Sequence, residues 1–188
     1  LTQLAPWWWG YAAVCWARAV HGTIGWLERR WTAAPAARAS NHTTAIDIAA
    51  ELGRPPIGDL MTACFSALPG QEMFQLHIQE KTLAIPQLPG RLDGLTILHL
   101  SDLHLSGRIG RAFFETVIEH ANDLQCDVAA VTGDIMDSEQ CLDWLPLTLG
   151  RLRTRLGAYF VLGNHDLRLR DTQGLRKALQ DLGLVDLG

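Results

Sequence analysis

The sequence has few cysteines, and their spacing builds no recognisable site. The 188 residues include four of them, and no two form the C-x-x-C pair of zinc or redox sites: Cys15, Cys64, Cys126 and Cys141. A disulfide framework is therefore excluded, because such frameworks need more cysteines at closer spacing. We interpret the four residues as buried or free thiols.

The chain also lacks an excess of charge of either sign. Its 16 basic and 20 acidic residues give a net charge of -4, so its surface as a whole does not attract nucleic-acid phosphates or anionic lipid. A helix-turn-helix outline ends in residues 57–68, but that segment lacks the cationic and amide side chains that contact DNA. Nucleic acid is therefore not expected as a partner.

Long hydrophobic runs are almost absent as well. The one membrane candidate, residues 7–27, carries Arg18 near its middle, which costs about 2.5–3.5 kcal/mol to insert. Six of the seven tryptophans lie in the first 31 residues, and indole rings also suit a membrane interface. No basic face accompanies them, so we favour a helix packed on the rest of the protein over peripheral membrane contact. We expect a cytoplasmic protein, with membrane association through the Trp-rich amino end as the alternative.

Residues 1–70 are predicted to form a helical extension that contains a linker. The linker near residues 33–40 is made of small residues and a proline. Thr44 followed by Asp47 predicts the capped start of a short helix, and a second short helix is predicted over residues 57–68. A domain of different texture is expected from residue 71 to residue 188.

That second domain is predicted to be α/β. Residues 72–79 alternate between apolar and polar side chains, as a half-buried strand does. Further along the chain, apolar runs of strand length alternate with segments of helical periodicity. The predicted strands cover residues 95–100, 128–131 and 159–162, and the predicted helices cover residues 111–124, 138–156 and 172–182. Such alternation implies βαβ units, and hence a parallel sheet with right-handed crossovers.

Residues with metal-binding side chains follow each of the three predicted strands. They are Asp102 and His104 after the first strand, Asp134 after the second, and Asn164, His165 and Asp166 after the third. Ligands of open parallel sheets bind beyond the carboxyl ends of the strands, so these side chains are expected to meet at one edge. Three such groups in succession are hard to explain by turn formation alone.

Carboxylate and imidazole groups in this arrangement predict a metal centre for Mn, Fe or Zn. The alternation of an extended chain puts Asp102 and His104 on the same side. Gly133 and Gly163 leave the backbone room to turn sharply. A carboxylate at Asp134 can bridge two ions, which is the arrangement that clamps a phosphoryl group.

Three short blocks resemble the first three signature blocks of the calcineurin-like metallophosphoesterases: SDLH at 101–104, TGD at 132–134 and GNHD at 163–166. The preceding segment, IPQLPGRLDGLTILHLSDLHL, resembles the bacterial phosphodiesterase branch of that family. The resemblance covers about residues 72–188. It implies an incomplete metallophosphoesterase-type sandwich and hydrolysis of a phosphoester, in particular a phosphodiester.

The resemblance also implies a role for each residue of the blocks. Two divalent metal ions would be held by Asp102, His104, Asp134 and Asn164, with Asp134 between them. His165 would donate a hydrogen bond or a proton to the phosphate or its leaving oxygen, and Asp166 would orient the His165 imidazole. The nucleophile would be a metal-bridging hydroxide.

Two neighbouring residues are given structural rather than chemical roles. Asp137, three residues after Asp134, is interpreted as a cap or first-turn residue of the following helix, although it could also shape the site. His99 is interpreted as a buried or sheet-facing histidine of its strand.

The family completes its site with further histidines from the second half of the domain, but this chain has no histidine after His165. We therefore expect an amino-terminal part that is weakly active or inactive alone and that exposes either an unpaired strand or an apolar face of its sheet. The alternative is a non-catalytic remnant that acts as a binding or interaction module. A third possibility is that a second chain supplies the missing ligands. The branch implies a nucleotide-linked or lipid-linked substrate, and the sequence does not choose between them.

Overall fold

The computed structural model describes residues 14–16, 18, 20–21 and 37–188. The chain divides into two compact units, residues 1–42 with 80–87 and residues 43–79 with 88–188. Within the described residues, no helix has both the length and the apolar character needed to cross a bilayer. The apolar segment 7–27 lies for the most part outside the described residues. The predicted division near residue 70 stays a prediction.

A two-stranded sheet is formed by β1 (Ala37–Asp47) and β2 (Gln75–Ala84). Strand β2 confirms the predicted strand over 72–79 and is longer. Strand β1 corrects the predicted helix start at Thr44 and the part of the expected linker that is described, residues 37–40; residues 33–36 lie outside the described residues, and the predicted short helix itself begins only after Asp47. Thr43 and Thr44 are β-branched and favour the extended chain over a helix start. Residues 37–70 are therefore not helical throughout.

Two short helices follow β1, and both begin at an aspartate. Helix α2 (Ile48–Glu51) starts after Asp47, whose Oδ1 accepts a hydrogen bond from Ala50 N at 3.1 Å. Thr44 is thus not the cap. Helix α3 (Leu60–Ser66) lies within the predicted helix 57–68 and is capped in the same way by Asp59.

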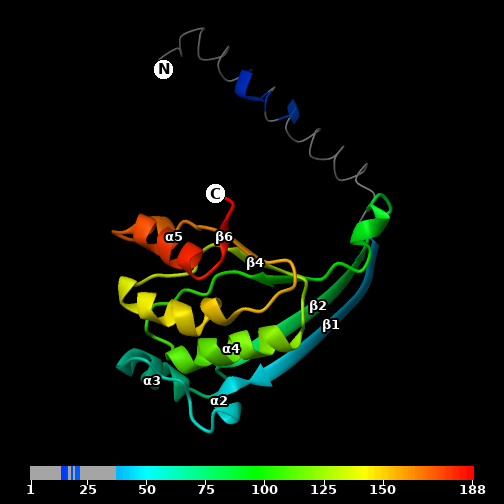
Figure 1. Cartoon of the computed structure of the whole chain (residues 1–188). Coiled ribbons are helices and arrows are strands. Elements are labelled where there is room, and N and C mark those ends of the chain that lie inside the picture. The colour runs from blue at the N-terminus through cyan, green and yellow to red at the C-terminus, as the bar shows by residue number, and fades with distance from the viewer. Residues whose placement is uncertain (1–13, 17, 19, 22–36) are drawn as a thin grey trace, which may run out of the picture. The chain divides into compact units, whose positions relative to one another are not determined.

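The larger sheet confirms the predicted α/β class (Figure 1). Its four strands are all parallel and lie in chain order: β3 (Ile97–Leu100), β4 (Val128–Thr132), β5 (Ala158–Val161) and β6 (Val185–Asp186). Helix α4 (Arg111–Asp123) connects β3 to β4, and α5 (Thr172–Asp181) connects β5 to β6. Each strand therefore pairs with its predecessor in the chain.

The connection from β4 to β5 is helical but not α-helical. It consists of the 3-10 helices η2 (Glu139–Leu147) and η3 (Leu149–Arg151). Pro146 lies inside η2 and has no N–H to donate to the preceding turn, so a continuous α-helix over 138–156 is disfavoured. Shorter 3-10 turns, η1 (Gly90–Leu92) and η4 (Asp166–Arg168), precede β3 and follow β5.

The core lies on one face of the four-stranded sheet. Val131 and Phe160 are paired in register and both 1% exposed, and they belong to one apolar cluster with residues of α4, η2 and α5. On the opposite face, Ile97 is 59% and Val185 48% exposed. Right-handed crossovers between successive neighbours put every connection on the same side, so these connections leave the other side of the sheet uncovered among the described residues. This confirms the expected exposed apolar face; the second layer of the predicted sandwich stays a prediction.

Candidate metal centre

The loops after β3, β4 and β5 meet at the carboxyl edge of the sheet. Asp102 N donates to Gly133 O at 3.2 Å and His104 N donates to Asp134 O at 2.9 Å, which ties the first loop to the second. His165 N donates to Oδ1 of Asp134 at 2.9 Å, which ties the third loop to the second. The three predicted blocks are thus neighbours in space.

Three of the predicted metal ligands have an unusual backbone. Asp102, His104 and Asp134 adopt φ values of 57°, 47° and 51°, in the left-handed region that side chains other than glycine rarely occupy. Each such residue costs on the order of 1–3 kcal/mol, and strain of this kind gathers at functional sites. The turns that follow β3 and β4 therefore place these side chains against the local preference of the chain.

Two glycines let the second and third loops approach each other. A Cβ atom on Gly133 would lie 2.7 Å from Gly163 Cα, and one on Gly163 would lie 2.2 Å from Oδ1 of Asp134. Both distances are too short for a side chain. Gly133 turns sharply as predicted, with a φ of +89°, and the neighbouring loop occupies the space that a side chain on either glycine would need.

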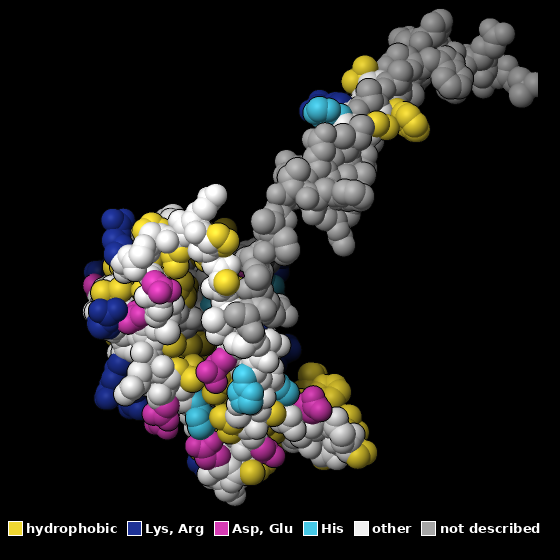
Figure 2. All heavy atoms as spheres, turned by 90° about the vertical axis from the view of Figure 1, so that its right-hand side faces the viewer, with side chains coloured by type: hydrophobic (Ala, Val, Ile, Leu, Met, Phe, Trp, Pro, Cys, Tyr) yellow, Lys and Arg dark blue, Asp and Glu magenta, His cyan; other side chains and the backbone are white. Residues whose placement is uncertain are grey.

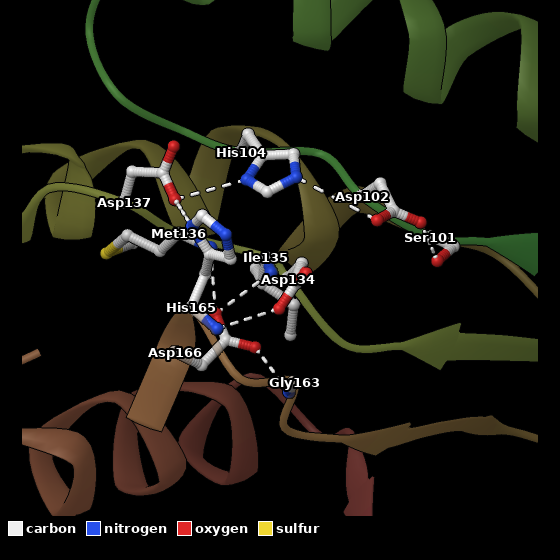
Figure 3. Close-up of polar contacts among 10 residues, drawn as sticks. All are labelled: Ser101, Asp102, His104, Asp134, Ile135, Met136, Asp137, Gly163, His165 and Asp166. Carbon is white, nitrogen blue, oxygen red and sulfur yellow. Dashed lines mark hydrogen bonds and ion pairs between the residues drawn. The ribbon is translucent and has the colours of Figure 1, made fainter. Parts of the chain in front are cut away.

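The side chains of Asp102, His104 and Asp134 come together. Each offers one ligand atom, and these atoms all lie within 4.8 Å of one another. Asp102 Oδ1 lies 3.8 Å from Nε2 of His104, and the other oxygen of Asp102 accepts a hydrogen bond from the Ser101 hydroxyl (Figure 3). Two carboxylates and an imidazole are donors that Mn, Fe and Zn accept, so this group fits a divalent cation.

Asn164 lies next to this group through its backbone. Its chain neighbours, Gly163 and His165, both border the carboxylate of Asp134. The residue is exposed in a turn, and its side chain has no hydrogen bond to another part of the described chain. Its predicted role as a ligand stays a prediction.

Asp137 links the two histidines of the site. Its Oδ1 lies 3.1 Å from Nδ1 of His104 and 2.8 Å from Nδ1 of His165, and Figure 3 shows the carboxylate facing both rings. The rings themselves meet edge to face, with centroids 4.7 Å apart. When Nδ1–H of His104 donates to Asp137, Nε2 of His104 carries the lone pair, and this atom lies on the side of Asp102.

The interpretation of Asp137 as a helix cap is corrected by these contacts. Helix η2 begins after Ser138 and has no side-chain cap. The signal in the sequence was the position of Asp137 in the same short loop as Asp134. Sequence reasoning passed over it because an acidic residue just before a helix already has a common structural explanation.

The contacts of Asp137 change the pKa values of the cluster. The hydrogen bond to Asp137 is the main reason why the pKa of His104 is raised, and the nearby carboxylates add to it although partial burial opposes it. Partial burial alone would raise the pKa of Asp137, but the hydrogen bonds and charges of His104 and His165 together lower it. These contacts thus favour the charged form of the Asp137 carboxylate beside the two imidazoles that donate to it.

Asp166 does not orient the His165 ring, contrary to expectation. It is fully buried, and its Oδ1 accepts hydrogen bonds from the backbone N–H groups of Ile135 and Met136, both at 2.9 Å. Its Oδ2 accepts from Gly163 N at 2.8 Å. Asp166 therefore fixes the loops after β4 and β5, and Asp137 contacts the imidazole instead.

The interpretation of His99 as buried is wrong, whereas its interpretation as sheet-facing agrees with its contact to β4. It is exposed on the open face of the sheet, where its Nε2 lies 2.6 Å from the hydroxyl oxygen of Thr132. The alternation of β3 had suggested burial, but a histidine on an open face remains in contact with water. Its contact reaches β4 and none of the ligand residues.

Comparison with known proteins identifies the segment that carries the site. Residues 95–186 match the family model described as calcineurin-like phosphoesterase. The zebrafish "Transmembrane protein with metallophosphoesterase domain" is 35% identical over 106 residues, which are 56% of this chain and 24% of that protein. The uncharacterized metallophosphoesterase YkoQ of Bacillus subtilis is 35% identical over 118 residues, 58% of this chain and 43% of its own.

A third relative has a named substrate. The UDP-2,3-diacylglucosamine pyrophosphatase LpxG of Chlamydia trachomatis is 33% identical over 93 residues, 48% of this chain and 28% of that protein. No solved structure matches the chain significantly. The chain spans about a quarter of the length of the vertebrate relatives and less than half of YkoQ.

Bacterial and vertebrate relatives match at similar identity, so the branch of the family is not resolved. The matched segment begins just before β3 and ends with the last residue of β6, and it contains all three loops of the candidate metal centre. The described site and the family match thus fall on the same residues. Over residues 95–186, the chain carries a calcineurin-like metallophosphoesterase domain.

Proposed function

We propose that this chain takes part in metal-dependent hydrolysis of a phosphodiester, with Asp102, His104, Asp134 and Asn164 as metal ligands. One observation carries the proposal: Asp102, His104 and Asp134 place their donor atoms within 4.8 Å of one another while all three hold a left-handed backbone. Family membership implies the phosphoester hydrolase class.

The residues of the chain divide the work between them. Divalent cations at these ligands would neutralise phosphoryl oxygens and activate water for attack. Asp137 holds both imidazoles through their Nδ1 atoms, so Nε2 of His165 can donate to a phosphate oxygen or to the leaving oxygen. Asp166 keeps Gly163 and the loop after β4 in place, and it acts as a positioning residue.

The ligand set within this chain is incomplete for two metals. One ion would have Asp102, His104 and Asp134, and the other would have only Asp134 and Asn164. We propose that the remaining ligands come from residues outside these 188, so the chain alone is expected to bind metal but to hydrolyse phosphodiesters slowly or not at all. The alternative role, a binding module without catalysis, would leave three strained backbones without a chemical use.

The proposed substrate carries its phosphoester on a lipid. LpxG, which is similar over the matched segment, is named for a diacylated sugar nucleotide. The sequence left two classes of substrate open, nucleotide-linked and lipid-linked, and the name of LpxG favours a lipid-linked substrate over one that is linked to a nucleotide alone.

Metal binding tests the proposal directly. Titration of the metal-free 188-residue chain with Mn²⁺, followed by electron paramagnetic resonance, is expected to show binding that Asp134→Asn abolishes. Asp143→Asn is the matched control, because Asp143 is exposed and its side chain makes no hydrogen bond or ion pair with another described residue. Equal Mn²⁺ binding by wild type and Asp134→Asn would refute the site.

Turnover tests the incompleteness of the ligand set. Bis-p-nitrophenyl phosphate with Mn²⁺ is expected to be hydrolysed far more slowly by this chain than by full-length YkoQ. A rate comparable to that of YkoQ, lost in Asp134→Asn, would show that these residues suffice.

A further inference from the structure

Apolar side chains gather at the surface around α3. Ile57, Leu60, Met61, Phe65 and Leu68 are all exposed, Leu60 to 82% and Phe65 to 51%. We call these five residues the α3 patch. Asp59 is the one charged residue between Ile57 and Leu68, and no charged residue follows it before Glu72. Figure 2 shows hydrophobic side chains on the lower part of its view, with acidic side chains and histidines among them.

The segment that carries the patch is fixed to the loop that follows His104. Gly58 N donates to Arg108 O and Gly110 N donates to Pro56 O, both at 2.8 Å, and Ile57 forms an antiparallel bridge with Ile109. A Cβ atom on Gly58 would lie 1.9 Å from Gly107 O, so the backbones of these two segments are in contact. The patch is therefore held on the same loop that leaves the metal centre.

A second attachment comes from α2. Nε2 of His120 on α4 lies 2.9 Å from Oε2 of Glu51 at the end of α2. The segment before α3 is thus attached to α4 as well as to the loop after His104. These two attachments hold the backbone that carries the exposed apolar side chains in a fixed position.

The charges beside the patch are suited to an anionic surface. Arg54 and Arg108 are both exposed: Arg54 lies two residues before Pro56 in the chain, and Arg108 lies on the loop whose backbone is hydrogen-bonded to Gly58. The one acidic residue between Leu52 and Gln71 is Asp59, and its carboxylate accepts a hydrogen bond from Thr62 N at 2.7 Å as the helix cap. Apolar side chains with arginines beside them match the boundary between acyl chains and anionic headgroups.

We propose that the α3 patch is a membrane-contact surface that seats this domain on an anionic lipid bilayer. Leu60, Met61 and Phe65 enter the boundary of the acyl chains, and Arg54 and Arg108 contact lipid phosphates. The proposal does not depend on the chemistry of the metal centre. It differs from contact through the Trp-rich amino end, since the patch and its support all lie within residues 43–188.

Vesicle sedimentation of the whole chain tests the patch. Wild type is expected to bind vesicles of phosphatidylcholine mixed with phosphatidylglycerol, and Leu60→Ser/Phe65→Ser is expected to weaken binding about tenfold or more. Ile97→Ser/Val185→Ser is the matched control, because it removes two side chains of similar exposure from the open sheet face. Arg54→Gln/Arg108→Gln is expected to lower binding to the mixed vesicles to the level seen with phosphatidylcholine alone.

A fluorophore locates the contact independently of the amino end. Cys64 is exposed on α3 and Cys141 is buried, so Cys15→Ser/Cys126→Ser directs a thiol-reactive bimane to Cys64. Its emission is expected to shift to the blue on vesicle binding. An unchanged emission from a chain that sediments with the vesicles would place the contact elsewhere and overturn the proposal.

Two other results would also overturn it. The Leu60→Ser/Phe65→Ser variant could bind vesicles as wild type does. Alternatively, wild type could ignore vesicles and sediment as a dimer that this variant dissociates, which would make the patch an interface between copies of the chain. Circular dichroism checks that the double variant is folded, and Leu60→Ser alone replaces it if it is not, since Leu60 is the most exposed residue of the patch.

Discussion

At the scale of single residues, the candidate metal centre depends on backbone conformations that most residues other than glycine avoid. Asp102, His104 and Asp134 keep a left-handed φ because backbone hydrogen bonds between loops hold them there. The sequence predicted these residues as metal ligands through their type and their position after strands, and the structure brings their side chains together. It could not show Asp137 in contact with both His104 and His165, because that contact depends on where the loop turns after Asp134.

Asp137 is expected to control the titration of His104. In the metal-free protein, Asp137→Ala should lower the pKa of His104, because the hydrogen bond that raises it is lost. Histidine NMR signals followed across the pH range measure this, and Mn²⁺ affinity should fall about 10- to 100-fold. Asp143→Ala serves as the control. An unchanged His104 titration in Asp137→Ala would show that Asp137 does not hold the imidazole in solution.

Gly133 is expected to tolerate no side chain, for two separable reasons. Gly133→Ala combines a φ of +89° with the 2.7 Å approach to Gly163. Gly94→Ala has a similar φ of +76° but open space around the new Cβ. Urea unfolding should show a loss of about 1 kcal/mol for Gly94→Ala and about 1–3 kcal/mol more for Gly133→Ala. Equal losses would mean that the loops separate easily.

At the scale of helices and strands, prediction succeeded where the pattern is local. The helical periodicity of residues 111–124 and 172–182 gave α4 and α5 nearly to the residue, and short apolar runs gave β3, β4 and β5. Strand β1 was missed because its pairing with β2 joins segments far apart in the chain, which periodicity does not reveal.

The amino-terminal ends of three strand segments are joined by Asp127. Its carboxylate accepts hydrogen bonds from Thr96 N at 3.0 Å and from Nε of Arg155 at 2.8 Å. The hydrogen bond from Arg155 is the main cause, followed by that from Thr96, of the lowered pKa of Asp127. This junction lies at the opposite edge of the sheet from the metal centre, so it can be altered without touching the ligands.

A lowered pKa in the folded state gives a definite pH dependence. Asp127 stabilises the fold above its unfolded pKa, about 3.9, and this contribution is lost as the pH falls through the lower folded pKa. Asp127→Asn should therefore unfold at lower urea concentration than wild type near neutral pH, and the difference should shrink in acid. The control Asp143→Asn should show no such change. A difference independent of pH would mean that the charge of Asp127 is not what stabilises the junction.

At the scale of the whole molecule, the four-stranded sheet has one covered and one open face. The strand order follows the chain, so all connections gather on one side and the core is one-sided. Periodicity could predict the strands, and the resemblance could predict an uncovered face, but the exposure of each residue depends on which side the helices pack.

The two faces should respond differently to the loss of a side chain. Phe160→Ala opens a cavity on the covered face and should cost about 3–5 kcal/mol of unfolding free energy. Ile97→Ala on the open face should cost less than about 1 kcal/mol, since the side chain is already 59% exposed. Chemical denaturation of the two variants measures both. A large loss for Ile97→Ala would show that its face is covered in solution.

The chain-ordered strands also bear on how the protein forms during synthesis. Each new strand pairs with the one made just before it, about thirty residues earlier, so every pairing step closes a loop of modest entropy cost. The edge that carries Asp102, His104, Asp134 and His165 is assembled once β5 has joined β4. A nascent chain can thus form the edge of the candidate metal site strand by strand as it leaves the ribosome. Ribosome-bound chains stalled after β5 should be protected against protease by Mn²⁺, and chains stalled before β5 should not.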